Sequence, residues 1–481
     1  MIEDLLAELE EDTSLAVGEQ FAAVTARYLE STRSGGGQVS TPRSAVDLAE
    51  RFNEDMPTDG RPIEEIVARL ERDVIADANK YYHPMYMGHQ TSAPLAAGIW
   101  TESVVGALNQ SLAVWEMSPT GSAIEHQVIR WFSQLAGYGN GAGGTLTSGG
   151  TEANFTAMLA ARNSALPDAW ENGVGSDPPY VVYGEHAHYA VTRAIGQLGI
   201  GRNRGIPVRS RNFKMNVHEL VATLDRLQRE EKTVMAVVAT AGSTATGSFD
   251  DLNFVGQLCE ERGLWLHIDG AHGASGVLSA HPRPELTGLR YSRSLAWDPH
   301  KMMLLPLSAG MVLTRDERDL ERAFAQQAPY LFHAGRSERV LDQGIRSFQC
   351  SRRADVLKLW VVIQRFGSKG LGRLYDHLCN TARILYDAIS ERDDFENVHE
   401  PESNILCFRY VGQLGGDTAR IDALNRELRP RYNREGTGWI TATVLDGRPV
   451  LRVTMMNPRT GATHVQALLD GLARKAAEIK A

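Results

Sequence analysis

The stretch Ser294-Leu295-Ala296-Trp297-Asp298-Pro299-His300-Lys301-Met302-Met303 joins an apolar, strand-like segment to a lysine through a proline-bounded turn. The residues that follow, 302–307, are again apolar. An ammonium held between two apolar segments loses much of its hydration, which favours a nucleophilic amine. A lysine at a strand end more often extends its head into water. Lys301 is therefore a candidate nucleophile whose role depends on its companions elsewhere in the chain.

The segment Trp265-Leu266-His267-Ile268-Asp269-Gly270-Ala271 places a carboxylate at the end of a short buried strand. There Asp269 could pair with the protonated ring nitrogen of a cofactor. The alternative is an aspartate that caps the turn after the strand.

Two further segments lie before this strand. In Thr147-Ser148-Gly149-Gly150-Thr151, glycines and hydroxyls open a helix-like run, which is typical of an anion site but also of an ordinary loop and N-cap. The segment Tyr183–Ala190 contains His186 and His188 at a strand-to-helix transition. A metal pair there lacks an evident third ligand nearby, so we expect no metal site.

Taken in order, the four segments resemble the group II pyridoxal-phosphate-dependent amino-acid decarboxylases, the family of glutamate, cysteine-sulfinate, aspartate, aromatic-amino-acid and diaminobutyrate decarboxylases. The resemblance extends from about Thr41 to the C-terminus. It implies a carboxy-lyase with pyridoxal 5'-phosphate as cofactor, bound to Lys301 as a Schiff base. Many members carry asparagine where this chain has Asp298. An acid near a phosphate is unfavourable unless it points away or is hydrogen-bonded.

The resemblance also assigns the other cofactor contacts. Asp269 would pair with the ring nitrogen, and His188 and Ala271 would lie on the two faces of the ring. Gly150, Thr151 and His300 would hold the phosphate, and Thr240 begins the strand-end loop beside the ring.

The resemblance further implies a homodimer with shared active sites. Tyr330, in a glycine-containing segment after a charged helix, matches the tyrosine of a loop that closes over the partner's site and protonates the substrate Cα. Cys350 and Ser351 would reach the partner's phosphate. The N-terminal segment, with an apolar stripe at Ile2, Leu5, Leu6 and Leu9, would pack across the dimer.

The substrate is the least determined part of the prediction. Arg452, flanked by apolar residues on a predicted strand, resembles the arginine that holds the substrate α-carboxylate; a solvent-facing arginine is the alternative. His89, Gln90 and Asn109 could hydrogen-bond an acidic side chain, which favours aspartate, glutamate or cysteine sulfinate. Ala113 and Trp115 leave room for a larger apolar or aromatic side chain, so an aromatic substrate stays open, as do diaminobutyrate and aliphatic substrates.

Two other functions compete with decarboxylation. An oxidative aldehyde synthase on the same scaffold typically has phenylalanine at the loop tyrosine, so Tyr330 argues against it. A non-catalytic homologue would be expected to lack Lys301 or Asp269, and both are present.

Hydrophobic periodicity predicts an α/β protein with a mainly parallel sheet covered by helices on both faces. The resemblance implies fold type I, the aspartate-aminotransferase-like fold, with a seven-stranded large domain and a small α+β C-terminal domain. We expect an N-terminal helical segment over 1–84, the large cofactor-binding domain over 85–370 and the small domain over 371–481. The predicted strands lie at 181–183, 234–240, 264–268, 294–297, 310–313, 404–410, 439–445 and 449–455.

Composition agrees with a soluble enzyme. The chain has 481 residues and a net charge of −9, which argues against a nucleic-acid-binding surface or a polybasic membrane patch. No apolar run approaches the roughly 18 residues of a membrane span. The start is acidic, and the four cysteines are scattered, so we expect a cytoplasmic protein with free thiols.

Overall fold

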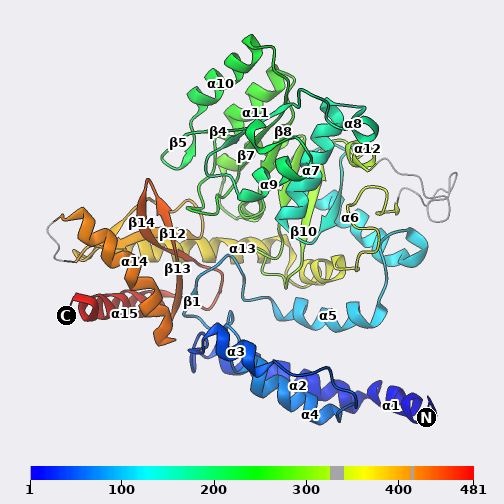
Figure 1. Cartoon of the computed structure of the whole chain (residues 1–481), viewed down its shortest axis with the longest axis vertical. Helices are drawn as coiled ribbons and strands as arrows, with labels where there is room; N and C mark the ends of the chain where they lie inside the picture. The colour runs from blue at the N-terminus through cyan, green and yellow to red at the C-terminus, as the bar shows by residue number, and fades with distance from the viewer. Residues whose placement is uncertain (1, 325–340, 413–415, 481) are drawn as a thin grey trace. The chain divides into compact units, whose positions relative to one another are not determined.

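The computed structural model describes residues 2–324, 341–412 and 416–480 (Figure 1). The chain divides into two compact units. The larger comprises residues 90–383 and 399–406, and the smaller comprises residues 1–89, 384–398 and 407–481. Each is described by itself.

The larger unit is built on a seven-stranded sheet. In spatial order its strands are β2 (Gly143–Thr147), β10 (Gly310–Thr314), β9 (Ser294–Trp297), β8 (Leu266–Asp269), β7 (Val234–Thr240), β3 (Tyr180–Gly184) and β4 (Gly205–Val208). The pairs from β9 to β4 are parallel, whereas β10 runs antiparallel to both of its neighbours. The predicted mainly parallel sheet is confirmed.

Helices cover both faces of this sheet, because alternate strand residues point to opposite sides. Val237 and Ala239 of β7 belong to one core cluster, and Ala236 and Val238 belong to the other. The first cluster is completed by α6 (Pro119–Leu135), α10 (Val217–Arg229), α11 (Leu252–Glu261) and α13 (Val356–Ser390). The second is completed by α7 (Gly150–Ala165), α9 (Tyr189–Gln197) and α12 (Arg318–Ala323).

The remaining elements of the larger unit are short or peripheral. They include α5 (Ala96–Leu108), α8 (Ala169–Asn172), the small hairpin of β5 (Ser210–Arg211) and β6 (Lys214–Met215), and short 3₁₀ helices.

The smaller unit contains a five-stranded sheet and several helices. Its strand order is β1 (Tyr86–Met87), β13 (Trp439–Leu445), β14 (Arg448–Thr454), β12 (Ile405–Tyr410) and β11 (Phe395–Asn397). The helices are α1 (Ile2–Asp12), α2 (Leu15–Arg33), α3 (Ala45–Arg51), α4 (Ile63–Arg69), α14 (Thr418–Glu435) and α15 (Ala462–Lys480).

The predicted hairpin in this unit is present, with one correction. The predicted first strand ends at Leu445 and the predicted second strand begins at residue 449, which leaves three residues for the turn. The structure begins β14 at Arg448, so the turn is the pair Asp446-Gly447, with φ angles of 49° and 76°. Two positive φ values suit a tight type I′ turn, which explains the shorter connection.

Candidate active site

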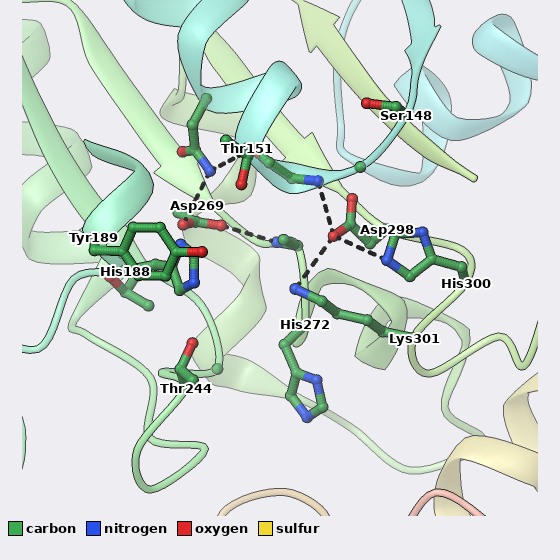
Figure 2. A pocket seen from close by; sticks show the side chains of 16 residues that line it. Ser148, Thr151, His188, Tyr189, Thr244, Asp269, His272, Asp298, His300 and Lys301 are labelled. Carbon is green, nitrogen blue, oxygen red and sulfur yellow. Dashed lines mark hydrogen bonds and ion pairs between the residues drawn. The ribbon is translucent and has the colours of Figure 1, made fainter. Parts of the chain in front are cut away.

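The carboxyl ends of the parallel strands deliver most of the candidate residues to one cavity in the larger unit. Thr240 ends β7, Asp269 ends β8 and Asp298 directly follows β9. The cavity has a volume of about 370 Å³ (Figure 2). Eight of the predicted site residues line it: Gly150, Thr151, His188, Thr240, Asp269, Ala271, His300 and Lys301. Ligands of open α/β sheets bind at this edge, where strands turn into loops.

Asp298 is the charge centre of one wall (Figure 2). Its Oδ2 lies 3.2 Å from Lys301 Nζ and 3.5 Å from His300 Nε2, and it accepts a hydrogen bond from Gly150 N at 3.0 Å. The carboxylate is 1 % exposed. Asp298 is thus hydrogen-bonded through Oδ2 and lies beside the lysine amine, and it accepts from the Gly150 N–H at the start of α7.

His300 is held by the turn that carries Lys301. Its Nδ1 accepts a hydrogen bond from Ala309 N at 3.2 Å. Burial lowers the pKa of the His300 imidazole, and the nearby Asp298 carboxylate partly opposes that effect. Because the backbone fixes Nδ1 as the acceptor, a neutral His300 presents an N–H at Nε2.

Asp269 lies on the other side of the cavity from Asp298 and Lys301 (Figure 2). Its Oδ1 accepts a hydrogen bond from Ala271 N at 3.2 Å, and its Oδ2 accepts one from Asn154 Nδ2 at 3.2 Å. The residue is 6 % exposed. Both oxygens are therefore held in place by neutral N–H donors, and each keeps a lone pair that can accept from a further donor in the cavity.

His188 caps the N-terminus of α9, because its Nδ1 accepts a hydrogen bond from Ala190 N at 3.2 Å. The ring packs beside Tyr189, with centroids 4.1 Å apart. Burial lowers the pKa of His188, although the Asp269 carboxylate raises it in part. The hydrogen bond from Ala190 N thus orients the His188 imidazole at the cavity wall.

Two features of the cavity suit a phosphorylated aromatic aldehyde. The N-terminus of α7 begins at Gly150, where an added Cβ would lie 2.9 Å from Asp298 Oδ2 and 3.0 Å from Ala271 Cβ. Glycine therefore lets the start of α7 pack against these two residues, and the N–H groups of a helix N-terminus favour an anion. Thr240 Oγ1 is buried at the cavity, and no described residue hydrogen-bonds it. A polar substituent on a bound ring could satisfy that hydroxyl.

Several predicted site residues do not line this cavity. Cys350 and Ser351 are exposed; the preceding Gln349 hydrogen-bonds Glu152 on the first turn of α7 at 3.0 Å. Gln90 and Asn109 belong to the same unit without lining the cavity. Tyr330 lies outside the described residues.

His89 and Arg452 belong to the smaller unit. Arg452 is 6 % exposed on β14, so the solvent-facing alternative is wrong, and its Nη1 donates to Thr441 Oγ1 at 3.2 Å. Burial lowers the pKa of the Arg452 guanidinium. Burial also lowers the pKa of His89, and the charges of Arg452 and Arg429 lower it further.

The cavity also contains Ser148, Gly149 and Asp298, which were expected at or near the anion site, and five residues for which no role was predicted: Asn154, Tyr189, Gly242, Thr244 and His272. Asn154 could have been found from helical spacing, because it lies one turn after Gly150 on the same face of α7. The position of His272 depends on the course of the backbone after Asp269, and no pattern in the sequence predicts that course.

Among the residues described, no group of three or more histidine, cysteine or acidic side chains could hold a metal ion. Nor does any helix in the described ranges have the length and apolar character needed to cross a bilayer.

A lysine amine, a buried carboxylate and a helix N-terminus converge on one cavity at the strand ends, which is the arrangement of a pyridoxal-phosphate-dependent enzyme. The family model described as the pyridoxal-dependent decarboxylase conserved domain matches residues 46–411. The chain belongs to this family, so it is a pyridoxal-phosphate-dependent amino-acid decarboxylase.

Relatives and a solved structure agree with this assignment. An L-2,4-diaminobutyrate decarboxylase of Acinetobacter baumannii is 30% identical over 98% of this chain and 94% of its own length. A cysteine sulfinic acid decarboxylase of Mus musculus is 32% identical over 91% of each chain. The crystal structure of mouse CSAD in apo form has a TM-score of 0.89 and 27% identity, and the match covers 96% of this chain and 99% of that one. The predicted fold type I is confirmed.

Proposed function

We propose that this enzyme removes the α-carboxylate of an acidic L-amino acid, namely aspartate, glutamate or cysteine sulfinate, and releases carbon dioxide and a primary amine. The observation that carries the proposal is the positive charge near His89 in the smaller unit: the His89 ring and the Arg429 guanidinium lie 5.0 and 5.2 Å from the Trp439 ring centroid, and the charges of Arg452 and Arg429 lower the His89 pKa. A buried guanidinium is stabilised by an anion. Two cations suit a substrate with two acidic groups, and the mouse relative is named for such a substrate.

A diaminobutyrate substrate is the alternative, favoured by the Acinetobacter relative that covers nearly the whole chain. Its second ammonium would be repelled by the charges around His89. An aromatic substrate has no comparable electrostatic argument for or against it.

A substrate panel decides between these possibilities. Purified enzyme is assayed with aspartate, glutamate, cysteine sulfinate, diaminobutyrate, tryptophan and tyrosine, and carbon dioxide and hydrogen peroxide are both recorded. We expect kcat/KM for one acidic amino acid to exceed that for diaminobutyrate by at least about tenfold, since one unfavourable charge contact accounts for roughly 1–2 kcal/mol. Arg452→Gln should weaken all substrates. A higher kcat/KM for diaminobutyrate would refute the acidic assignment.

When bound, pyridoxal phosphate supplies the electron sink that accepts the electron pair left by carbon dioxide. In the proposal Lys301 holds the cofactor covalently, and Asp269 keeps the ring nitrogen protonated. His188 and Ala271 would contact the ring, and Thr240 would lie beside it. The phosphate is held by Gly150, Thr151 and His300.

The remaining residues of the proposal act on the substrate and on the freed lysine. Arg452 holds the α-carboxylate, while His89, Gln90 and Asn109 bind the side chain. Asp298 balances the Lys301 ammonium whenever the amine is free, as the 3.2 Å contact between them indicates.

We further propose that the active unit is a homodimer in the cytoplasm. The apolar stripe of α1 is exposed in the single chain, with Leu5, Leu6 and Leu9 each about half accessible. A second exposed apolar stripe lies on α5 and consists of Trp100, Val104 and Leu108. Large apolar side chains aligned in this way favour burial against another subunit. Cys350 and Ser351 would then contact the partner's phosphate. The four cysteines are free, which supports a reducing compartment.

Tyr330 is proposed to protonate Cα from the partner's loop, which gives a prediction about products. Tyr330→Phe should keep cofactor binding, but the electron pair at Cα should persist long enough for dioxygen to react with it. Amine formed per carbon dioxide should fall, while peroxide, ammonia and aldehyde rise. All of these products are measured in one reaction; unchanged stoichiometry with weaker substrate binding would indicate a purely structural tyrosine.

The same variant tests whether the loop acts across the dimer. Mixing Tyr330→Phe subunits with Lys301→Ala subunits gives hybrid dimers in about half of the population, each with one complete site out of two. Amine production should therefore recover to about a quarter of the wild-type level. If verified subunit exchange restores nothing, each site is built from one chain.

A further inference from the structure

A chain of buried hydrogen bonds continues from Asp269 into the interior of the larger unit. Asn154, on α7, donates from Nδ2 to Asp269 Oδ2 at 3.2 Å. Its Oδ1 lies 2.8 Å from His267 Nε2, and His267 Nδ1 lies 2.9 Å from Ser294 Oγ. The chain ends at Trp265, whose Nε1 donates to Ser294 Oγ at 2.8 Å. It therefore connects α7, β8 and β9 with the carboxylate at the cavity.

Chemistry fixes the direction of every hydrogen bond in this chain. The Asn154 amide nitrogen faces two acceptors, Asp269 Oδ2 and the Gly150 carbonyl at 2.7 Å, so the amide oxygen must face His267. The imidazole therefore presents N–H at Nε2 and accepts at Nδ1. Ser294 then donates its hydroxyl hydrogen to His267.

The other end of the chain agrees with this direction independently. An indole N–H can only donate, so Trp265 supplies a hydrogen to Ser294 Oγ and leaves the hydroxyl hydrogen for His267. All donors thus point toward the Asp269 carboxylate. Reversing any one of them would place two donors or two acceptors face to face.

Burial makes this arrangement rigid. His267 and Ser294 have no exposed surface, Asn154 is 1 % exposed and Trp265 is 5 % exposed. Burial lowers the pKa of His267 to about 4, so the imidazole is neutral near pH 7 and offers one donor and one acceptor. Polar groups packed in this way are costly to leave unpaired, so each one constrains the next.

We propose that Asn154 and His267 are positioning residues that set the orientation of the Asp269 carboxylate toward the cofactor's ring nitrogen. The inference rests on the proposed role of Asp269. His267 does not line the cavity, whereas Asn154 does, and in this scheme both act through Asp269. Ser294 and Trp265 hold His267 in the required tautomer, and their effect should weaken with distance along the chain.

The test measures cofactor binding rather than turnover. Apoenzymes are titrated with pyridoxal phosphate, and the Kd and the circular dichroism of the bound cofactor's visible band are recorded. His267→Leu should raise the Kd for pyridoxal phosphate by about tenfold and alter the dichroic band. The reason is that the Asp269 carboxylate, the partner of the cofactor's ring nitrogen, is then no longer held in one orientation. His267→Gln, which can still donate to Asn154, should recover most of the affinity. Trp265→Phe should have a smaller effect than His267→Leu.

Asn163→Leu is the matched control for Asn154→Leu. Asn163 is also a buried asparagine of α7, but its amide bonds the carbonyls of Arg322 and Ala323. If both variants lower the thermal midpoint of the apoenzyme similarly, but Asn154→Leu changes Kd and dichroism in the same way as His267→Leu, whose side chain does not line the cavity, the effect is one of positioning. Equal changes in Kd would overturn the proposal.

A double-mutant cycle separates this inference from the proposed role of Asp269. In the Asp269→Ala background, His267→Leu should leave the Kd for pyridoxal phosphate unchanged within about twofold, because the carboxylate that His267 orients is absent. If Asp269→Ala weakens binding and His267→Leu still adds its full tenfold effect, the positioning role is wrong while the role of Asp269 stands. If Asp269→Ala itself leaves Kd and dichroism unchanged, both are wrong.

Discussion

Lys301→Ala enzyme should bind pyridoxal phosphate without a covalent bond and should show no measurable decarboxylation. The Lys301 amine is the nitrogen that the structure places at the cavity, beside Asp298. The expected loss is at least about 10⁴-fold in kcat, because no other lysine of the described residues lines the cavity and could take over covalent attachment and release. Borohydride treatment followed by mass spectrometry shows whether the cofactor is attached, and carbon dioxide release measures turnover.

The same substitution removes the cation from a buried carboxylate. Asp298 is 1 % exposed, so the alanine variant should also lose stability, by roughly 1–3 kcal/mol in the apoenzyme. Lys301→Arg is the matched control, because it keeps the positive charge but offers no nucleophilic amine. It should restore the thermal midpoint and remain inactive. Appreciable turnover in either variant would contradict the assignment of Lys301.

The sequence anticipated the elements that depend on long apolar runs. The strands over 234–240 and 294–297 have the predicted bounds, since buried parallel strands are continuous runs of apolar residues. Two strands of the same sheet, β2 and β4, were not predicted. The first begins Gly143-Gly144, and the second contains Pro207; both lie at sheet edges, where low strand propensity is tolerated.

The candidate site was anticipated where residues share a strand end and missed where they depend on side-chain direction. Lys301 was expected in apolar surroundings, and its neighbours Met302 to Leu305 are indeed buried. Its amine nevertheless faces the Asp298 carboxylate, because the turn after β9 directs both side chains to the cavity. Sequence spacing shows which residues are close along the chain, but it does not predict the direction in which a turn points their side chains.

The second large effect is expected at Asp269. Asp269→Asn should lower kcat by about 10³-fold or more, because the neutral amide cannot keep the ring nitrogen protonated. The substitution also disturbs local hydrogen bonding. The two aspartate oxygens accept separately from Ala271 N and Asn154 Nδ2, so an amide group must turn its NH₂ toward one of these donors. Cofactor affinity should therefore fall together with kcat.

Charge and geometry can be separated with a modified cofactor. Asp269→Ala leaves space beside the ring nitrogen, and pyridoxal phosphate methylated at that nitrogen carries a permanent positive charge. If the carboxylate acts mainly by keeping the ring charged, the methylated cofactor should recover at least about tenfold in kcat over the ordinary cofactor in this variant. Asp269→Glu, which retains the charge but moves it by one methylene, should keep more activity than either variant. If the reaction does not need a protonated ring nitrogen, the opposite result is expected. The kcat of Asp269→Asn would then lie within tenfold of wild type, and the methylated cofactor would not raise the kcat of Asp269→Ala.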